Sequence, residues 1–352
     1  MVRRMTSMDQ RVLVAMSGGV DSSVAALLLL RQGYEVFGAT MDTGYGDAPN
    51  LAKQVCEGLG IPHYVIDVRV PFQEQVVVPF LQSYLRGETP NPCVLCNSRI
   101  KFPLFQPLMT ELGISYFSTG HYIRIQEQQG RYVLRCATDE QKDQSYFLYG
   151  LDQALLCRCI FPLGEINKTQ ARSLAAAAGL SAAQRKDSYD ICFIPNGDYR
   201  ELLRESVSDW LCPGDILDQS GRVVGRHNGV ANYTLGQRRG LELALGEPVY
   251  VLEIDVKHNR LVVGPKHALM HQHMMVRENN FLPFDTLDQP LRVEVKIRYK
   301  AAAQSGTLYP MAEPGKIKVY FDSPQWGVTP GQSAVYYDGD LLIGGGVIQC
   351  GF

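Results

Sequence analysis

The sequence has no long hydrophobic run. Across its 352 residues, no apolar stretch approaches the roughly 18 residues that a transmembrane helix needs. The segment from Met1 to Gln10 is basic and polar, and it lacks the apolar centre of a signal peptide. Internal repeats and low-complexity tracts are missing too. We therefore expect a cytoplasmic globular protein, in which 45% of the residues are hydrophobic and 20% are charged.

A large net charge is also absent. The 34 Lys and Arg residues are offset by 36 Asp and Glu residues, which leaves a formal charge of −2. A nucleic-acid partner would have to bind local basic patches, because the chain as a whole is not a polycation. The length favours two or three domains, and a monomer is the default expectation.

The nine cysteines do not indicate a disulfide framework, since disulfides are rare in cytoplasmic proteins of this size. Most lie among apolar or helical neighbours, where we expect small buried hydrophobic residues. These are Cys56, Cys136, Cys157, Cys159, Cys212 and Cys350. The remaining cysteines, Cys93, Cys96 and Cys192, need a separate explanation.

Cys93 and Cys96 form a Cys-x-x-Cys motif directly after the proline-stiffened turn 89–92. The chain lacks a second Cys-x-x-Cys or a His-x-x-x-His that would complete a structural zinc site. A thioredoxin-like redox pair would be expected at the start of a helix in a much shorter domain. Cys192 stands alone in an apolar, strand-like segment. The pattern alone leaves half of a metal site, a redox pair and a catalytic thiol with a helper open.

The glycine-rich turn Ser17-Gly-Gly-Val-Asp-Ser-Ser23 has no Gly-Lys-Ser/Thr ending, so it is not a Walker A loop. Two consecutive glycines let the backbone approach an anion closely. A following helix would direct unpaired N–H groups and its positive dipole end at that anion. Ser17, Ser22 and Ser23 can add hydroxyl donors. The turn predicts a pyrophosphate site, and the simpler alternative is a turn that only closes the sheet.

The first third of the chain alternates between strand-like and helical segments, which predicts a doubly wound parallel sheet covered by helices. Strands are expected at 12–16, 35–41, 63–68 and 116–125, and helices at 23–31, 49–59 and 72–85. Ligands of such sheets bind beyond the carboxyl ends of the strands. That rule brings the 17–21 turn, Met41 and the segment 119–121 to one rim.

Later segments change in character. Helices are expected at 152–157 and 168–178, the second with Asn167 as its N-cap. After residue 196, Gly- and Pro-rich turns separate short β-like runs, and from about residue 274 alternating patterns predict a small β-barrel. We expect an α/β domain with the glycine-rich turn over 1–200, a small central domain over 201–273 and a C-terminal β-barrel over 274–352.

Over nearly its whole length, the chain resembles the bacterial tRNA-specific 2-thiouridylase family of PP-loop ATP pyrophosphatases, whose first domain has an adenine nucleotide α-hydrolase-like fold. The resemblance is carried by Ser17-Gly-Gly-Val-Asp-Ser22, Asn91-Pro-Cys-Val-Leu-Cys-Asn97, Thr119-Gly-His-Tyr122, Lys142-Asp-Gln144, Asp187-Ser188, Ile191-Cys-Phe193, Thr234-Leu-Gly-Gln-Arg-Arg-Gly240, Ile297-Arg-Tyr299 and Thr329-Pro-Gly-Gln332. It implies a sulfurtransferase that moves AMP from ATP onto the C2 oxygen of the wobble uridine, position 34 of tRNA. Persulfide sulfur then replaces this oxygen, which gives 2-thiouridine, AMP and pyrophosphate.

The resemblance also implies the site residues. Cys96 would be the nucleophile, and Cys192 would carry a persulfide received from a sulfur-donor protein. ATP with Mg²⁺ is expected at Ala15, Met16, Ser17, Gly18, Gly19, Val20, Asp21, Ser22, Met41 and Gly120, with Asp21 as the Mg²⁺ partner. The target base is expected at Asn91, Pro92 and Cys93. The tRNA anticodon stem-loop is expected at His121, Lys142, Asp143, Gln144, Arg298, Tyr299 and Gln332.

Two sulfur routes give the same products. Cys96 can attack the persulfide on Cys192 and release hydrosulfide, which leaves a disulfide, or the persulfide can attack the activated carbon first. Either route needs thiolates, so a cation such as Arg99, Lys101 or Lys186 should lie nearby.

Other interpretations stay open. The position of Cys93 is aspartate in many relatives of the family and cysteine in others. Because it is cysteine here, the three thiols Cys93, Cys96 and Cys192 could instead hold an iron–sulfur cluster whose open iron binds hydrosulfide. A PP-loop amidotransferase or ligase would have no use for these cysteines, and a non-catalytic RNA-binding iron–sulfur scaffold would not turn over ATP. Without the resemblance, Arg298 and Tyr299 would be ordinary barrel residues.

Overall fold

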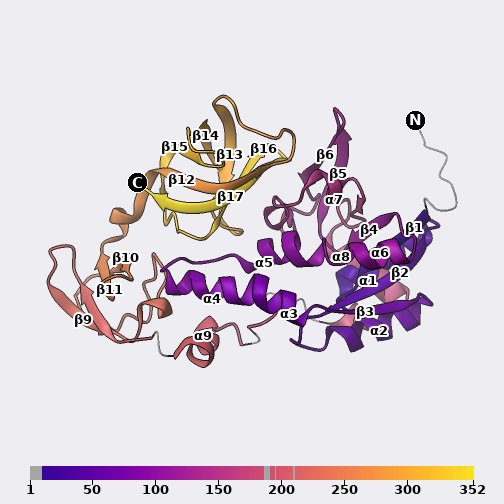
Figure 1. The fold of residues 1–352 in the computed structure, drawn as a ribbon, viewed down its shortest axis with the longest axis horizontal. Coiled ribbons are helices and arrows are strands. Elements are labelled where there is room, and N and C mark those ends of the chain that lie inside the picture. The colour runs from indigo at the N-terminus through magenta and orange to yellow at the C-terminus, as the bar shows by residue number, and fades with distance from the viewer. Residues whose placement is uncertain (1–9, 186–190, 195, 209–210) are drawn as a thin grey trace. The chain divides into compact units, whose positions relative to one another are not determined.

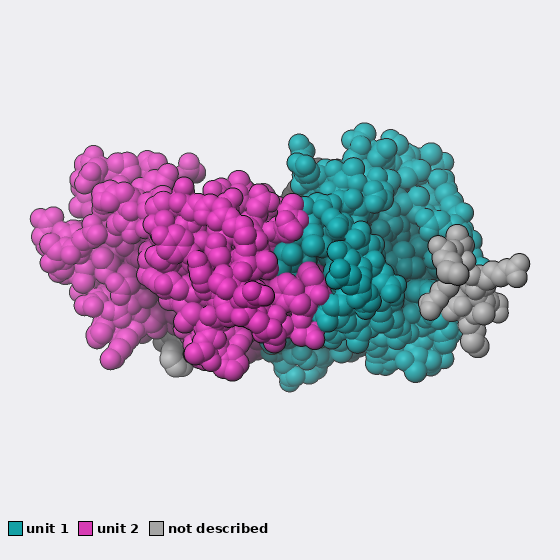
Figure 2. All heavy atoms as spheres, turned by 90° about the horizontal axis from the view of Figure 1, so that it is seen from above, with its two compact units in different colours: residues 1–76, 93–193, 340–343 teal, residues 77–92, 194–339, 344–352 magenta. Residues whose placement is uncertain are grey.

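The computed structural model describes residues 10–185, 191–194, 196–208 and 211–352. The chain forms two compact units, coloured separately in Figure 2. Unit 1 comprises residues 1–76, 93–193 and 340–343, and unit 2 comprises residues 77–92, 194–339 and 344–352. Among the described residues, no helix combines the length and the apolar character needed to cross a bilayer.

Unit 1 contains the parallel sheet that the sequence predicts (Figure 1). Every strand pairing in it is parallel, in the order β3-β2-β1-β4-β7. Ala15, the last residue of β1, lies opposite Ala39 and Thr119, so the carboxyl ends of three strands share one edge. The strands are β1 (Arg11–Ala15), β2 (Glu35–Asp42), β3 (His63–Asp67), β4 (Tyr116–Thr119) and β7 (Cys159–Ile160).

Helices bury this sheet. In β1, Val12 and Val14 on one face and Leu13 on the other are all fully buried, as expected for a parallel strand covered on both faces. Val12 and Val14 share a core with α1 and α8. Asn167 caps α8 in a capping box with Gln170, which confirms the predicted N-cap. The unit 1 helices are α1 (Val20–Arg31), α2 (Ala48–Leu59), α3 (Arg69–Phe72), α5 (Pro92–Leu95), α6 (Gln106–Glu111), α7 (Gln153–Leu156) and α8 (Lys168–Ala177), with 3₁₀ turns at Ser145–Phe147 and Ser181–Gln184.

Two predicted elements are wrong in detail. The helix expected over 72–85 is divided into α3, a π-helical segment Gln73–Val77 and α4 (Val78–Leu85), because prolines near the starts of α3 and α4 lack the N–H that a continuous helix needs. The strand expected over 116–125 ends at Thr119. β5 (Ile123–Gln128) follows after a break and pairs antiparallel with β6 (Arg131–Cys136), outside the parallel sheet.

Unit 2 contains a small sheet of order β10-β11-β8-β9 around Ile216, Val251 and Leu261. It also contains a closed barrel, in which β12, β15, β14, β13, β16 and β17 follow one another and β17 pairs with β12. The barrel confirms the predicted C-terminal architecture, although the polar strand β12 was not predicted. The elements are α4, α9 (Tyr199–Val207), β8 (Gly214–Leu217), β9 (Val223–His227), β10 (Tyr250–Asp255), β11 (Arg260–Gly264), β12 (Met270–Phe281), β13 (Leu291–Lys296), β14 (Gln304–Pro310), β15 (Ile317–Trp326), β16 (Ser333–Asp338) and β17 (Leu341–Gly351), with 3₁₀ turns at Val230–Asn232 and Lys266–Leu269.

The cysteines outside the motifs are only partly as predicted. Cys56 and Cys159 are buried, and Cys136 and Cys350 are half-buried. Cys157 and Cys212 are exposed, so the expectation of burial is wrong for them. The bounds of the three expected domains stay a prediction.

Candidate active site

The glycine-rich turn joins β1 to α1. Gly18 has φ of +74°, and a Cβ atom there would lie 2.5 Å from Leu51 Cβ, so only glycine fits. Gly19 is the N-cap of α1 and makes no side-chain cap hydrogen bond. A Cβ atom on Gly19 would approach only Ser17 Oγ, at 3.5 Å, so the space before the helix is open. These are the features of an anion cradle at a helix N-terminus.

The serines shape this turn. The Ser23 hydroxyl is buried and donates to Gly19 O at 2.7 Å, so the expectation that it faces the anion is wrong. Ser22 Oγ donates to the same carbonyl at 3.3 Å and accepts a hydrogen bond from Ser17 N at 3.2 Å. Ser17 is exposed at the mouth of the turn. Arg185 also donates to Gly18 O, which ties the turn to a distant segment.

Asp21 has partners that the sequence did not predict. Lys168 Nζ lies 2.7 Å from Asp21 Oδ1 and 2.8 Å from Oδ2, and the Tyr122 hydroxyl donates to Oδ1 at 2.8 Å. Lys168 stands in the first turn of α8, and Tyr122 is buried. A lysine at the start of a helix opposes the helix dipole, and this was the available signal for Lys168. The structure thus brings a cation beside the turn.

The other two residues expected at the nucleotide lie on the same sheet edge. Met41 is half-buried near the carboxyl end of β2. Gly120 follows β4, and a Cβ atom there would lie 2.6 Å from Ser22 N. Gly120 therefore allows its backbone to pack against the start of α1. This close approach also explains why the strand ends at Thr119.

Cys93 and Cys96 lie one helical turn apart, in α5 and in the π-helical segment Cys96–Lys101. Cys192 lies in an exposed turn, so the strand-like setting expected for it is wrong. The next residue, Phe193, is buried against Tyr45 and Phe72 in unit 1, with ring centroids 6.0 Å and 5.7 Å away. None of the nine cysteines, all of which lie among the described residues, is part of a disulfide.

The three thiols act on one another electrostatically. Although the Cys192 residue is exposed to solvent, the side chains around it desolvate its thiol, and this is the main reason why its pKa is raised to about 11; the neighbouring Cys96 and Cys93 contribute to that value. Burial also raises the pKa of Cys93 and of Cys96. Lys101 lowers the pKa of all three thiols, so it is the cation that favours their thiolates.

The net upward shift was not expected, since Cys96 and Cys192 were predicted to favour the thiolate. Arg99 is exposed and does not contribute to these shifts. Lys186, and the motif residues Asp187 and Ser188, lie outside the described residues.

His121 belongs to the interior of unit 1. It is buried, its Nδ1 lies 2.7 Å from Thr119 Oγ1, and its ring stacks on Phe102. Burial, reinforced by Lys101, keeps the pKa of His121 well below its usual range. The ring is therefore neutral, and the predicted contact of His121 with tRNA stays a prediction.

The segment 142–144 is also tied into the fold. Asp143 is buried and accepts hydrogen bonds from Ala137 N at 2.9 Å and from Ser145 Oγ at 2.6 Å. Gln144 Oε1 accepts from Tyr122 N at 3.0 Å, and Gln144 N donates to Tyr122 O at 3.0 Å. Lys142 is half-buried. Asp143 and Gln144 thus hold the backbone around Tyr122, the partner of Asp21.

In unit 2, the segment before the Cys-x-x-Cys motif is attached to the barrel. Gln332 Nε2 donates to Thr89 O at 3.1 Å and to Pro90 O at 3.5 Å, and Thr89 N donates to Pro330 O at 2.8 Å. Gly331 has φ of +88°, and a Cβ atom there would lie 2.9 Å from Thr89 N. The 329–332 motif therefore holds the strand-free segment that leads to half-buried Asn91 and buried Pro92.

Arg298 is engaged within the barrel. Its Nη2 donates to the carbonyls of Trp326 at 3.0 Å and Gly327 at 3.1 Å, and its guanidinium lies 4.9 Å from the Trp326 ring centroid. Tyr299 is half-buried. Among the residues that the structure describes, no group of three or more His, Cys, Asp or Glu side chains is arranged to hold a metal ion.

A parallel α/β domain with this first βα turn defines the class of PP-loop nucleotide-binding proteins. Residues 10–196 match the model described as "tRNA methyl transferase HUP domain", 200–265 the "tRNA methyl transferase PRC-barrel domain" and 271–348 the "Aminomethyltransferase beta-barrel domain". The tRNA-specific 2-thiouridylase MnmA of Clostridium acetobutylicum is 42% identical over 97% of this chain and 100% of its own length. MnmA 1 of Clostridium tetani is 43% identical over 97% of each chain. The chain belongs to the tRNA-specific 2-thiouridylase family.

A solved structure, the predicted subunit of tRNA methyltransferase from Methanocaldococcus jannaschii, matches more weakly. It is 21% identical, the match covers 47% of this chain and 74% of that chain, and the TM-score is 0.32.

Proposed function

We propose that this chain catalyses the ATP-dependent 2-thiolation of the wobble uridine of tRNA. The observation that carries the proposal is that unit 1 holds both an anion cradle and three thiols that share one electrostatic environment. The matched domain models are described by methyl transfer, whereas the relatives are named for 2-thiolation. Clustered thiols suit sulfur transfer, because one thiol can carry a persulfide and a second can resolve it.

The first step makes the uracil C2 oxygen a leaving group. The oxygen attacks the α-phosphorus of ATP, the bond to the β-phosphate breaks, and pyrophosphate leaves. We assign the phosphates to the segment Ala15–Ser22, because Gly18 admits no side chain and the start of α1 faces open space. Met41 and Gly120 are assigned to the adenosine. Asp21 is the side chain on the turn with the chemistry to hold Mg²⁺, which would supply positive charge against the phosphates.

The second step brings the sulfur. A persulfide on Cys192 is attacked at its inner sulfur by the Cys96 thiolate, which forms a Cys96–Cys192 disulfide and releases hydrosulfide. Hydrosulfide adds to C2, and AMP leaves with the former oxygen. The disulfide must then be reduced by a thiol before the next turnover. Direct attack of the persulfide on C2, followed by attack of Cys96 on the adduct, balances in the same way.

Substrate and partners follow from the same reaction. A wobble base is stacked in the anticodon loop, so it must be turned out towards Asn91, Pro92 and Cys93 at a cost of a few kcal/mol. We assign tRNA contacts to the predicted set, with Asp143 and Arg298 acting through the backbone that they hold. A sulfur-donor protein supplies the persulfide, and we propose a monomeric, cytoplasmic enzyme.

The test is single-turnover thiolation of unmodified tRNA with ATP and a persulfide donor. Cys192→Ser and Cys96→Ser should both abolish 2-thiouridine, as measured by mass spectrometry of the nucleosides. Cys157→Ser is the matched control, because Cys157 is an exposed thiol in the same unit outside the cluster, and it should retain full activity. Full thiolation by Cys192→Ser would refute the persulfide role of Cys192, whereas a wild-type chain that cleaves ATP but forms no 2-thiouridine would refute the proposed function and favour a PP-loop ligase.

The iron–sulfur alternative rests on the same three thiols. It predicts that anaerobically purified protein contains iron and thiolates tRNA with hydrosulfide alone, and that aerobic, iron-free protein is inactive. The persulfide mechanism predicts thiolation by the iron-free protein. Iron content and single-turnover activity, measured on both preparations, separate the two mechanisms.

A further inference from the structure

Unit 2 contains a pocket that is formed neither by the glycine-rich turn 17–23 nor by Cys93, Cys96 and Cys192. Its volume is about 440 Å³, and it opens between α9 and the loop 228–240. Pockets of about 300–1,000 Å³ are of the size that binds a small molecule or one group of a larger one. Three arginines line it, Arg200, Arg204 and Arg239, whereas Asp198 is the only acidic side chain in its described lining.

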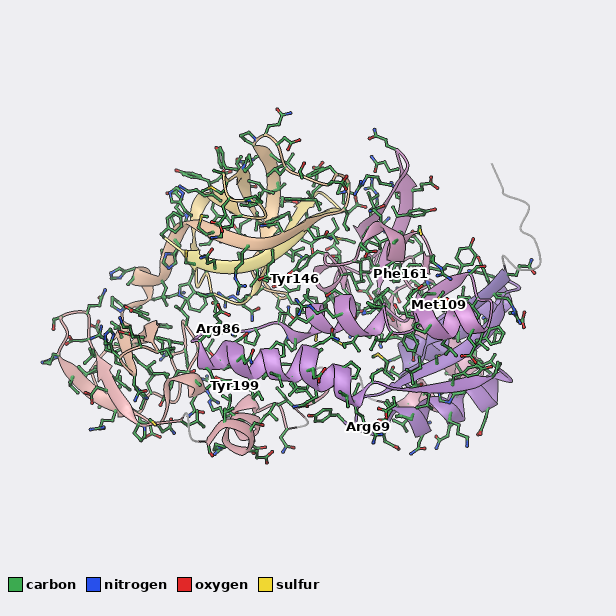
Figure 3. The ribbon with its side chains drawn as sticks, viewed as in Figure 1. Arg69, Arg86, Met109, Tyr146, Phe161 and Tyr199 are labelled. Carbon is green, nitrogen blue, oxygen red and sulfur yellow. The ribbon has the colours of Figure 1, made fainter. Side chains whose placement is uncertain are left out.

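The α9 side of the pocket is rigid. Arg200 and Arg204 lie four residues apart and so share one helix face. Arg200 Nε donates to Asn232 O at 2.9 Å, and its guanidinium lies 5.3 Å from the Tyr199 ring centroid. Tyr199, labelled in Figure 3, stacks on Tyr84 with centroids 4.0 Å apart. These contacts hold the start of α9 in place and leave Arg204 exposed above it.

The opposite side is formed by the 234–240 motif, to which the proposed reaction gives no role. Gln237 Oε1 accepts from Thr234 N at 3.1 Å, and its Nε2 donates to Arg239 O at 2.9 Å. Gly236 N donates to Val251 O at 2.8 Å, which fixes the loop to β10. The motif is thus a braced turn that presents the exposed side chains of Arg238 and Arg239.

The charges of the pocket are not balanced by the protein. Asp198 caps α9 by accepting from Arg200 N at 3.0 Å, and it lies 3.5 Å from the Arg200 guanidinium. Arg204 Nε donates to Arg200 O at 3.2 Å, a bond that leaves its charge uncompensated. No ion pair to Arg204 or Arg239 is found among the residues that the structure describes. Two guanidinium groups are therefore available to an anion.

We propose that this pocket binds a phosphodiester of the tRNA backbone, at a distance along the RNA from the base that reacts. Arginine forks match the oxygen geometry of phosphate and bind it through paired charged hydrogen bonds. Arg238, the neighbour of Arg239, lines an adjoining hollow together with Glu242 and Glu247, so the excess of positive charge is confined to the pocket itself. Because Arg204 and Arg239 are both exposed, they can meet a phosphate of a polymer at the surface, and tRNA is the polyanion that the proposed reaction brings to the chain. The inference depends on the proposed function, because it takes tRNA as the substrate.

The experiment measures the affinity of the full-length chain for unmodified tRNA over a series of KCl concentrations. The double variant Arg204→Gln/Arg239→Gln should bind about tenfold more weakly, and the slope of log Kd against log salt should fall by about 2, one for each lost phosphate contact. Arg239→Lys keeps a charge and should keep most of the slope. Thiolation at saturating tRNA should continue in all of these variants.

The control is Arg222→Gln/Arg226→Gln, which removes the same charge from another part of unit 2, at β9 and the residue before it. Both arginines are exposed, and they pair with Asp218 and Asp215 outside the pocket. Equal weakening by the control would overturn the inference, because only general charge would then matter. Wild-type affinity and slope in the pocket variant would overturn it too, as would a loss of ATP affinity with unchanged tRNA binding. None of these outcomes touches the proposed function, which fails only if the wild-type chain does not thiolate tRNA.

Discussion

Lys168 stands where the local sequence disfavours a cation. A positive charge in the first turn of a helix opposes the dipole by about 0.3–1 kcal/mol. The Asp21 carboxylate compensates for this, since it lies within 2.8 Å of Lys168 Nζ with both of its oxygens. Asp21 contacts both Lys168 and Tyr122, and it thereby holds the lysine beside the glycine-rich turn 17–23, which is called the phosphate turn below. The role of Asp21 as the Mg²⁺ partner stays a prediction.

Replacing this lysine separates the two steps of the reaction. Lys168→Met should lower tRNA-dependent pyrophosphate release at least 100-fold, a loss of about 2.7 kcal/mol of transition-state stabilisation, because the charge that meets the phosphates is removed. The affinity for tRNA should change less than threefold. Lys168→Arg, which keeps the charge, should recover part of the rate. Unchanged pyrophosphate release by Lys168→Met would show that the lysine only supports the fold.

The raised pKa of Cys192 predicts how the reactivity of its thiol changes with pH. A folded pKa of about 11 means that Cys192 is almost entirely protonated near neutral pH, so its thiolate fraction rises tenfold with each pH unit. Alkylation of Cys192 by iodoacetamide, followed by mass spectrometry, should therefore keep accelerating above about pH 9, where an ordinary cysteine with a pKa of about 8.5 has levelled off.

Lys101 supplies the control for this measurement. Because Lys101 lowers the pKa of all three thiols, Lys101→Met should raise these pKa values and slow the alkylation of Cys192 at a fixed pH. A rate that levels off near pH 8.5 in both proteins would contradict the assignment of a raised pKa.

At the scale of elements, the sequence predicted what local patterns can specify. The strands of the parallel sheet were found because burial on both faces gives continuous apolar runs such as Val12–Val14. The β5–β6 hairpin was missed because the break at Gly120 comes from packing against Ser22, far away in the chain. The ion pair of Lys168 and Asp21 was missed for the same reason, because its two residues lie 147 positions apart in the chain. The thiols were predicted from the motifs, whereas their raised pKa values depend on burial, which no local pattern shows.

The attachment of the 329–332 motif to Thr89 and Pro90 separates two roles for Gln332. The family resemblance implies contact with tRNA, and the structure shows its amide on the carbonyls of the segment that leads to the target-base residues. If positioning dominates, Gln332→Ala should lower kcat for thiolation about tenfold with tRNA affinity within threefold. Loss of affinity with normal kcat would favour direct contact. Gln325→Ala is the control, since Gln325 bonds only locally, to Ser323 O.

At the scale of the whole molecule, the residues expected to bind ATP and the thiols expected to transfer sulfur form two separate groups in unit 1. The phosphate turn follows β1, and the thiols lie on α5, the adjoining π-helical segment and the turn at Cys192. Neither group of side chains forms part of the other's hydrogen-bond network among the described residues. Unit 2 adds the arginine pocket and the attachment of the 89–92 segment. The reaction can therefore be interrupted between activation and sulfur transfer.

The double variant Cys96→Ser/Cys192→Ser tests this separation. Because its phosphate turn, Lys168 and the arginine pocket are intact, it should still release pyrophosphate from ATP when unmodified tRNA is present, in a burst of about one equivalent per enzyme, while forming no 2-thiouridine. The adenylated tRNA should then accumulate on the enzyme or hydrolyse slowly. Radiolabelled ATP and nucleoside mass spectrometry measure both products in one reaction. A variant that releases no pyrophosphate would show that sulfur must be loaded before the base is activated, and that the two groups of residues act as one.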